Sequence, residues 1–227
     1  ENNPYTWILN NGSSDNMKNE GKMFDKSTMF GLFFRGDYSY KGKYLATVTV
    51  RRDASSRFGE DNRWGTFPSV ALGWRVTEES FMKDQQVLSN LKLRASYGVT
   101  GQQDGIGNYN YLPVYTISQD GAQGIVGGTP IYTYRPEAYV SDLKWETTKQ
   151  TDIGIDLSVL GGRISLVADY YYKKTVDLHY DKILPYYTGY SSQTQNIGSK
   201  SNKGWEFSLN TQNLVGDFKW STSLNIA

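Results

Sequence analysis

Residues able to carry chemistry are few in this chain, and they are scattered. The sequence has one histidine, His179, and no cysteine. These counts argue against a histidine-rich metal site or a histidine-based catalytic triad, and they exclude disulfides, thiolate zinc sites and cysteine nucleophiles. The formal net charge of +1 gives no electrostatic case for nucleic-acid binding. We therefore expect no enzyme active site, and we expect His179 to be a loop or rim residue.

The glycine-rich run GQQDGIG at residues 101–107 superficially resembles a nucleotide-binding loop. It lacks the strict glycine spacing, a following helical pattern and a Lys-Ser/Thr pair, so ordinary loop glycines explain it better. Four carboxylates of the same region could ligate calcium, but no EF-hand spacing supports this. They are Asp104, Asp120, Glu137 and Asp142. We interpret them as solvated loop carboxylates, and we expect no cofactor and no metal.

Tyrosines gathered in two long connections are the best candidates for ligand contact. An aromatic ring can stack on the apolar face of a sugar while neighbouring Gln, Asn and Asp side chains bind its hydroxyls. The same rings suit a peptide, a protein lid or packing of one loop on another, because Tyr is enriched at interfaces generally. The predicted contact residues are Gln102, Gln103, Asp104, Tyr109, Tyr111, Tyr115, Tyr132, Tyr134, Tyr187 and Tyr190, with Tyr186 beside them.

The long connections join segments of about ten residues in which hydrophobic and polar residues alternate. Phe218, Trp220 and Leu224 share one parity, for example, while Lys219 and Ser221 share the other. A tilted strand of about ten residues spans a bilayer's hydrocarbon core, whereas strands of soluble sheets usually have about five or six. The pattern predicts an all-β antiparallel transmembrane β-barrel. About eight strands are expected, near residues 27–40, 43–53, 67–76, 91–100, 145–159, 164–172, 205–210 and 218–226.

The connections between these segments fall into two length classes. Short ones are expected at 41–42, 161–162 and 212–216, with a moderate one at 77–90 that could hold a helical turn. Long, irregular ones are expected at 54–66, 101–143 and 176–203, and residues 1–25 also read as a loop. Outer-membrane barrels combine short periplasmic turns with long extracellular loops. Aromatic girdles should then include Tyr38, Tyr40, Tyr44, Phe218 and Trp220 at the periplasmic end and Tyr170, Tyr172 and Trp205 at the extracellular end.

Charged residues mostly have the parity opposite to the apolar side chains. We interpret them as lumen charges in cross-strand pairs, which tune a channel while satisfying one another. They are Arg35, Arg51, Arg75, Lys92 and Arg94 with Asp37, Asp152, Asp156 and Asp169. A soluble antiparallel sandwich also has one hydrophobic face, so the alternation alone leaves that fold open.

Longer motifs are more specific. The segment RRDASSRFGEDNRWGTFPSVALGWRVTEESF at 51–81 resembles a signature of SusC/RagA-type TonB-dependent transporters of Bacteroidetes outer membranes, with Ala54 in place of a usual glycine. The segments LKLRASYGVTGQQ (91–103), DLKWETTKQTDIGIDLSVLGGRISLVADYYYKKTVDL (142–178) and NIGSKSNKGWEFSLNT (196–211) are similar to that family in the same order. The resemblance covers more than half of the chain.

This resemblance implies a 22-stranded barrel with a plugged lumen, an architecture known for transporters of that size. It implies import of a glycan or an oligopeptide, a SusD-like surface lipoprotein as a lid, and TonB acting on an N-terminal plug. We expect residues 1–227 to form part of one barrel domain as an internal piece of a longer protein, without the plug. Two other classes stay open: a soluble β-sandwich glycan-binding module, and a β-sandwich glycosidase, which needs a carboxylate pair across a cleft.

Overall fold

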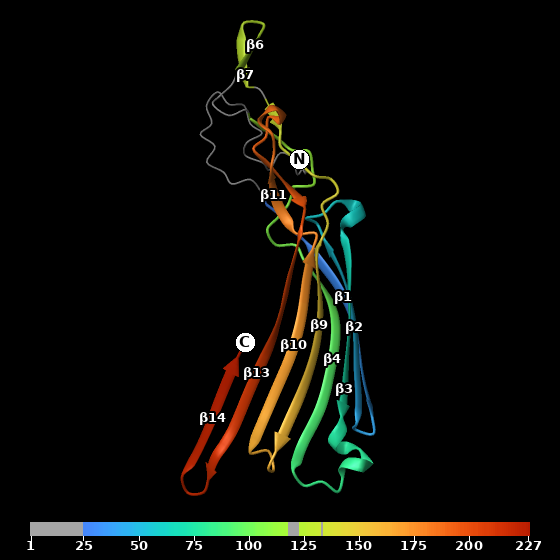
Figure 1. Cartoon of the computed structure of the whole chain (residues 1–227). Coiled ribbons are helices and arrows are strands. Elements are labelled where there is room, and N and C mark those ends of the chain that lie inside the picture. The colour runs from blue at the N-terminus through green and yellow to red at the C-terminus, as the bar shows by residue number, and fades with distance from the viewer. Residues whose placement is uncertain (1–24, 118–122, 133) are drawn as a thin grey trace.

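Eight long antiparallel strands form one curved sheet (Figure 1). The computed structural model describes residues 25–117, 123–132 and 134–227. The strand order follows the chain, β1-β2-β3-β4-β9-β10-β13-β14, so each long strand lies beside the long strand that precedes it. Their bounds are β1 Met29–Tyr40, β2 Tyr44–Ser55, β3 Trp64–Arg75, β4 Leu88–Gln102, β9 Glu146–Val159, β10 Ile164–Val176, β13 Ser199–Val215 and β14 Lys219–Ile226.

Strand length confirms the prediction from alternation, since seven of these strands have 12 or more residues. Several strands extend beyond the bounds that the sequence pattern predicted. β3 starts at Trp64 instead of residue 67, and β13 runs from Ser199 to Val215 with a register shift between Gln212 and Leu214. The turn expected at 212–216 therefore lies a few residues later. No helix in the described part of the chain is long and apolar enough to cross a membrane.

Short turns lie at one end of the sheet and long connections at the other (Figure 1). The β1–β2 turn is tight because Lys41 and Gly42 both adopt positive φ, at 53° and 69°. The connection after β3 contains two single-turn 3₁₀ helices, η4 Val76–Glu78 and η5 Ser80–Met82. A third 3₁₀ helix, η3 Glu60–Asn62, lies in the long connection after β2. The division into two length classes is confirmed.

The two longest connections hold more regular structure than expected. Residues 101–143 include β5 Tyr115–Ile117, β6 Gln123–Val126, β7 Thr129–Tyr132 and β8 Tyr134–Pro136, and residues 176–203 include β11 His179–Ile183 and β12 Ser192–Asn196. They pair as β5–β8, β6–β7 and β11–β12, each a two-stranded sheet. A two-stranded ribbon in a loop can form without a buried face on either side, so its residues carry no alternation to detect. The expectation of irregular loops was wrong for these segments.

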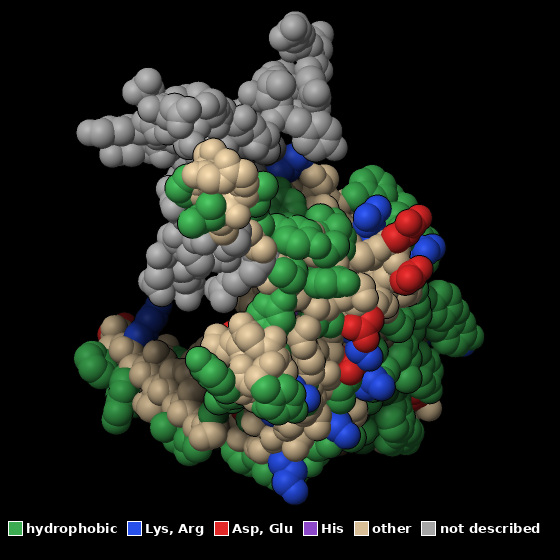
Figure 2. Space-filling view, turned by 90° about the horizontal axis from the view of Figure 1, so that it is seen from above, with side chains coloured by type: hydrophobic (Ala, Val, Ile, Leu, Met, Phe, Trp, Pro, Cys, Tyr) green, Lys and Arg blue, Asp and Glu red, His purple; other side chains and the backbone are tan. Residues whose placement is uncertain are grey.

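The main sheet has an apolar face and a polar face, set by residue parity. Register partners such as Val48 and Val70, or Leu93 and Ile155, lie on the apolar face, and most of its large side chains are exposed. Figure 2 looks onto the loop end and shows hydrophobic side chains along much of the rim. No second layer covers this face in the described residues, so the β-sandwich alternative is not supported. An exposed apolar band of this kind is typical of lipid-facing barrel wall.

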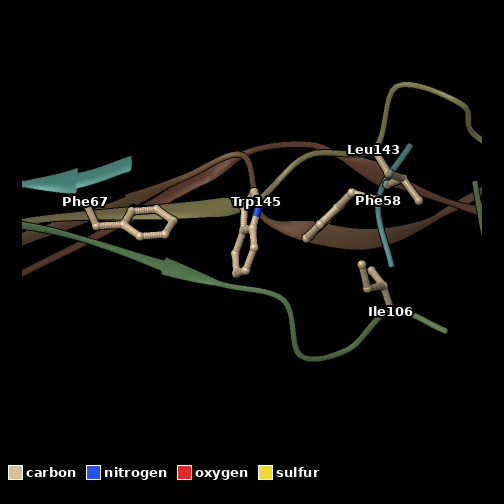
Figure 3. Packing of buried hydrophobic residues seen from close by; sticks show 5 residues of the cluster. All are labelled: Phe58, Phe67, Ile106, Leu143 and Trp145. Atoms are coloured by element: carbon tan, nitrogen blue, oxygen red, sulfur yellow. The ribbon is translucent and has the colours of Figure 1, made fainter. Parts of the chain in front are cut away.

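A buried apolar cluster lies where the sheet meets its loops (Figure 3). The Phe58 ring is fully buried and lies 4.9 Å from the Trp145 ring, while Phe67 meets Trp145 edge-on at 5.6 Å. Leu143 and Ile106 complete the cluster. These residues come from the loop after β2, from β3 and from the two ends of the long connection between β4 and β9. The cluster therefore fastens two long loops to the top of the sheet.

Candidate functional site

The loops at the open end of the sheet form one assembly. Asn196 at the end of β12 donates to the backbone oxygens of Lys144 and Asp177, and its own side-chain oxygen accepts from the Lys144 N–H. His179 reaches the Lys144 oxygen at 2.7 Å, and its backbone N–H donates to Glu146 at 2.6 Å. The His179 side chain is nearly fully buried, lying between these groups and the Phe58 ring. His179 is thus a buried residue that helps to hold the base of the loops together. It is more buried than a rim residue would be.

Between the two long connections lies a cleft of about 830 Å³. One wall is the end of β8 with residues 136–138, and the other is the tip of the β11–β12 hairpin at residues 183–192. The Tyr190 hydroxyl donates to the Pro136 oxygen at 2.9 Å, which joins the two walls. Gln193 makes a second link by donating to the Tyr139 oxygen at 2.8 Å. Two hydrogen bonds therefore hold the two walls of the cleft together.

The hairpin tip displays its aromatic rings. A 3₁₀ turn, η7 Tyr186–Thr188, ends at Gly189, which adopts a left-handed φ of 78°. This tight reversal leaves Tyr186 fully exposed and Tyr187 88% exposed. Among the described residues that line the cleft, Glu137 alone is charged, and the others are aliphatic, aromatic or neutral polar. Such a surface can stack on a ring and hydrogen-bond to a neutral polar ligand.

The predicted contact residues divide between this cleft and the loop base. Tyr190 lines the cleft, and Tyr187 belongs to the same turn. Tyr115 and Tyr134 lie on the β5–β8 ribbon, where Tyr115 is the register partner of Pro136, and both are exposed. The Tyr132 side chain lies outside the described residues. Tyr115, Tyr134, Tyr187 and Tyr190 thus gather around one end of the molecule.

The other predicted contacts support the loop base. Tyr109 accepts a hydrogen bond from the Lys26 N–H at 3.1 Å. Tyr111 is half-buried, and Gln102 is the last residue of β4. Gln103 donates weakly to the Met29 sulfur, and Asp104 lies 4.0 Å from Arg57. The structure does not bring these five residues to the cleft.

Arg57 joins the loop after β2 to the start of the β4–β9 connection. Its Nε donates to the Asn108 side chain at 2.9 Å and its Nη1 donates to the Gln103 oxygen at 3.3 Å. Together with the burial of Phe58, these bonds join the 54–63 loop to the start of the β4–β9 connection. Within the motif at 51–81, Arg57 and the buried Phe58 and Phe67 therefore help to fasten the loops to the sheet.

Several cleft residues escaped prediction. Pro136, Ile183 and Leu184 line it although nothing in their local pattern distinguishes them from other loop residues. Tyr186, which was named beside the predicted contacts, also lines the cleft, and the Pro-Tyr-Tyr-Thr-Gly run at 185–189 marks a tight turn with aromatic residues. The remaining residues meet only because two connections far apart in sequence fold together.

The polar face of the sheet carries an ion-pair network across three strands. Arg94 on β4 contacts Asp156 on β9 at 2.8 Å and Asp169 on β10 at 3.0 Å. It reaches across β9 because Gly154 lies between, where a side chain would collide with Asp169 and Arg94. Arg94, Gly154 and Asp169 line a hollow of about 310 Å³ on the polar face. Ser96 and Asp152, which are hydrogen-bonded at 3.1 Å, line it as well.

The expectation of cross-strand charge pairs holds for Arg94 and fails elsewhere. Arg35 pairs with Asp37 at 2.9 Å, and Arg51 pairs with Asp53 at 2.7 Å, each within a single strand. Residues two apart on a strand lie on the same face, so an arginine can fold along its own strand to reach the acid. Asp156 and Asp169 are both ion-paired with Arg94, and this pairing does not suit the acid and base of a glycosidase.

Glu79 organises the short-turn end. Its carboxylate accepts hydrogen bonds from Lys43 at 2.9 Å, Tyr44 at 2.7 Å and Trp74 at 3.1 Å. These hydrogen bonds lower the pKa of Glu79 to about 2. The bond from Lys43 has the largest effect, followed by those from Tyr44 and Trp74. The Tyr40, Tyr44 and Trp74 rings stack in a row at 6.4 Å spacings. Two residues of the predicted aromatic girdle at that end, Tyr40 and Tyr44, belong to this row, together with Trp74.

The described residues contain no group of three or more His, Cys, Asp or Glu side chains able to hold a metal ion. Among the acids considered for calcium, Asp104 is largely exposed beside Arg57, and Glu137 lies in the cleft wall. Asp120 lies outside the described residues. The absence of a cofactor stays a prediction.

Comparison with known proteins gives consistent matches. Residues 2–227 match the model of a family described as TonB dependent receptor-like, beta-barrel. The chain is 47% identical over 203 residues to the TonB-dependent receptor SusC of Bacteroides thetaiotaomicron, covering 88% of this chain and 20% of that protein. It is 39% identical over 227 residues to the TonB-dependent receptor P39 of Formosa agariphila, covering 100% of this chain and 21% of that protein. The chain thus spans about a fifth of the length of these relatives.

Solved structures agree. The fold matches the RagAB peptide transporter with a TM-score of 0.77 at 31% identity, covering 88% of this chain and 21% of that chain. It also matches the siderophore receptor PirA from Pseudomonas aeruginosa with a TM-score of 0.56, covering 88% of this chain and 34% of that chain. At 17% identity the second match shows the fold alone.

Proposed function

The chain belongs to the TonB-dependent receptor family of β-barrels, as the SusC-like motifs indicated, and we propose that it forms barrel wall and loops of a nutrient importer. Its place is the outer membrane of a Bacteroidetes-type cell. The apolar face contacts lipid and the polar face lines the lumen. Import needs a plug and the TonB complex acting on it, which the proposal assigns to the whole protein. The proposal includes no bond chemistry.

The observation that carries the substrate proposal is the cleft between β8 and the β11–β12 hairpin. A volume of about 830 Å³ accommodates several sugar rings, and exposed Tyr186 with hydrogen-bonded Tyr190 offers an aromatic wall. Because Glu137 is the one charged residue among the described lining residues, the cleft suits a neutral glycan better than a charged peptide. An oligopeptide is the second candidate, favoured by the likeness to the RagAB peptide transporter.

The partner proposal is a SusD-like surface lipoprotein that closes over the loops. The β6–β7 ribbon projects farthest from the sheet (Figure 1), and Ile125 and Val126 on it are exposed, as Ile183 is on β11. Exposed apolar side chains on projecting loops are typical of interaction surfaces. Changing Ile125 and Val126 to Asp should then reduce co-purification of the lipoprotein with the full-length protein.

Binding of defined oligosaccharides and oligopeptides to the full-length protein with its co-purified lipoprotein tests the substrate class. Calorimetry should show Tyr186→Ala weakening glycan binding about fivefold, the loss expected for one aromatic contact. Tyr180→Ala is the matched control, since Tyr180 is an exposed tyrosine of the same hairpin that does not line the cleft. Binding of peptides alone would replace the glycan proposal, and equal effects of both variants would remove the cleft from it.

A further inference from the structure

Charge is distributed unequally between the two faces of the eight long strands. Every acidic residue of these strands lies on the polar face, as register and parity place them: Asp37, Asp53, Glu146, Asp152, Asp156, Asp169 and Glu206. The apolar face carries four charged residues, all cations: Arg52, Lys149, Lys174 and Lys203. Each lies within five residues of the loop end of its strand. The lipid-facing surface is therefore purely cationic at this end.

Three of these cations form a compact group, the outer lysine cluster of Lys149, Lys174 and Lys203. Lys149 on β9 and Lys174 on β10 are direct register partners. Lys203 on β13 pairs with Tyr172, two residues from Lys174 on the same face. Directly opposite residues of an antiparallel pair have Cβ atoms about 4.5–5.5 Å apart. The cluster thus spans three neighbouring strands at nearly one height.

No acidic side chain of the described residues compensates the charge of the outer lysine cluster. All three lysines are exposed, and none makes an ion pair with another described residue. Like charges directly opposite each other on a sheet are destabilising. Arg52 differs, because its guanidinium lies 4.8 Å from the Trp64 ring and so has an aromatic partner. An anion supplied from outside the protein would remove the repulsion among the lysines.

The residues around the outer lysine cluster indicate the source of this anion. On the side toward the middle of the sheet, the apolar face carries Tyr170 and Trp205, whose rings lie 5.1 Å apart, followed by Ile153 and Phe207. Tyr and Trp with such neighbours sit at the boundary between hydrocarbon and headgroups. Lysines one step farther out reach headgroup level with their flexible stems. Figure 2 shows Lys and Arg side chains among the hydrophobic ones on the rim at this end.

We propose that Lys149, Lys174 and Lys203 form a binding site for the phosphate group of a phosphorylated lipid in the outer leaflet. Basic clusters at headgroup level attract anionic lipids through each Lys or Arg near the surface. A protein lid docks on the loops above, whereas these side chains point sideways into the leaflet. The site lies on the face opposite the lumen, so it is separate from the path of the imported nutrient.

The experiment uses the full-length protein in phosphatidylcholine nanodiscs with and without lipid A, and with lipid A whose phosphates have been removed by phosphatase. Native mass spectrometry counts bound lipid for the wild type, for Lys149→Gln/Lys174→Gln/Lys203→Gln and for a matched control. The control is Lys173→Gln/Lys200→Gln, because those lysines lie on β10 and β13 at nearly the same height but on the polar face. Nutrient binding is measured in parallel and should be equal in all three proteins.

The proposal requires that the wild type and the control both bind phosphorylated lipid A. Each lysine removed from the outer lysine cluster should lower the affinity on the order of fivefold. The proposal also requires weaker binding at high salt, because exposed charges are screened. Equal binding by the triple variant, or equal binding of dephosphorylated lipid A, would overturn it. Loss of nutrient binding in the control alone would bear on the import proposal and leave the lipid site unaffected.

Discussion

Replacing Phe58 by alanine should loosen the loops while leaving the barrel wall intact. Phe58 is fully buried against Trp145, Leu143 and Ile106, and it belongs to the loop that fastens the β4–β9 connection. Removing a buried phenylalanine side chain costs about 3–5 kcal/mol. The long strands do not include Phe58, so this cost falls on the docked loops. The loop unit should then open locally, below the free energy of global unfolding.

The expected size of the effect follows from that cost. At about 1.4 kcal/mol for each factor of ten, opening becomes about a hundredfold to several thousandfold more frequent. Hydrogen exchange of the full-length protein measures this at amides whose bonds depend on the docked loops. Suitable amides are Ser55, which donates to Arg63 at 3.1 Å, and Val140, which donates to Asn110 at 3.0 Å.

A matched control and a reference region make the result decisive. Phe81→Ala removes a phenylalanine that is 68% exposed at the short-turn end, so it should change loop exchange by less than about 0.5 kcal/mol. Amides in the middle of β9 and β10 should keep their protection in both variants. The reasoning is refuted if the loop amides of Phe58→Ala exchange as in the wild type, or if strand amides lose protection equally.

Two other predictions concern the strands and the short-turn end. Gly154→Ala should destabilise the full-length barrel by about 1–3 kcal/mol, the usual cost of overpacking, because its methyl group would collide with Asp169 and Arg94; denaturant titration should show no comparable loss for Gly98→Ala, whose methyl group would meet only Ser69 at 3.4 Å. The pKa of Glu79 is lowered to about 2 from an ordinary 4.5, so its stabilising contribution is complete above pH 4.5 and is lost as the pH falls toward 2. The stability difference between the wild type and Glu79→Gln should therefore shrink over that window, and a difference independent of pH would contradict the assigned role of the carboxylate.

Alternation of side chains predicted the long strands because one physical condition acts along their whole length. Each strand of the wall has lipid on one side and a polar space on the other, so the period of two is imposed at every residue. Leu93, Ile153 and Trp205 could be placed on the apolar face in this way, and Arg94 and Asp169 on the polar face. Strand ends were less well placed, because hydrogen bonding continues past the lipid boundary where the pattern stops.

The loops show where such reasoning ends. The β5–β8, β6–β7 and β11–β12 ribbons have strands of only three to five residues, so their pairing left no detectable period. Burial of Phe58 was equally hidden, because a phenylalanine between Arg57 and Gly59 in a polar loop carries no sign of the cluster it enters. The candidate tyrosines were chosen because of their residue type. Residue type alone could not show which of them lie at the cleft and which at the loop base.

By itself the sequence determined the architecture of the wall, the faces of its strands and the family, since these depend on period and on motifs that are local in the chain. Tertiary structure decided which distant residues meet. It brought Pro136 against Tyr190, placed Arg94 between two acids of other strands, and set Lys149 opposite Lys174. Such meetings depend on register and on loop docking, which arise from many weak contacts along the sheet and have no local signature in the chain.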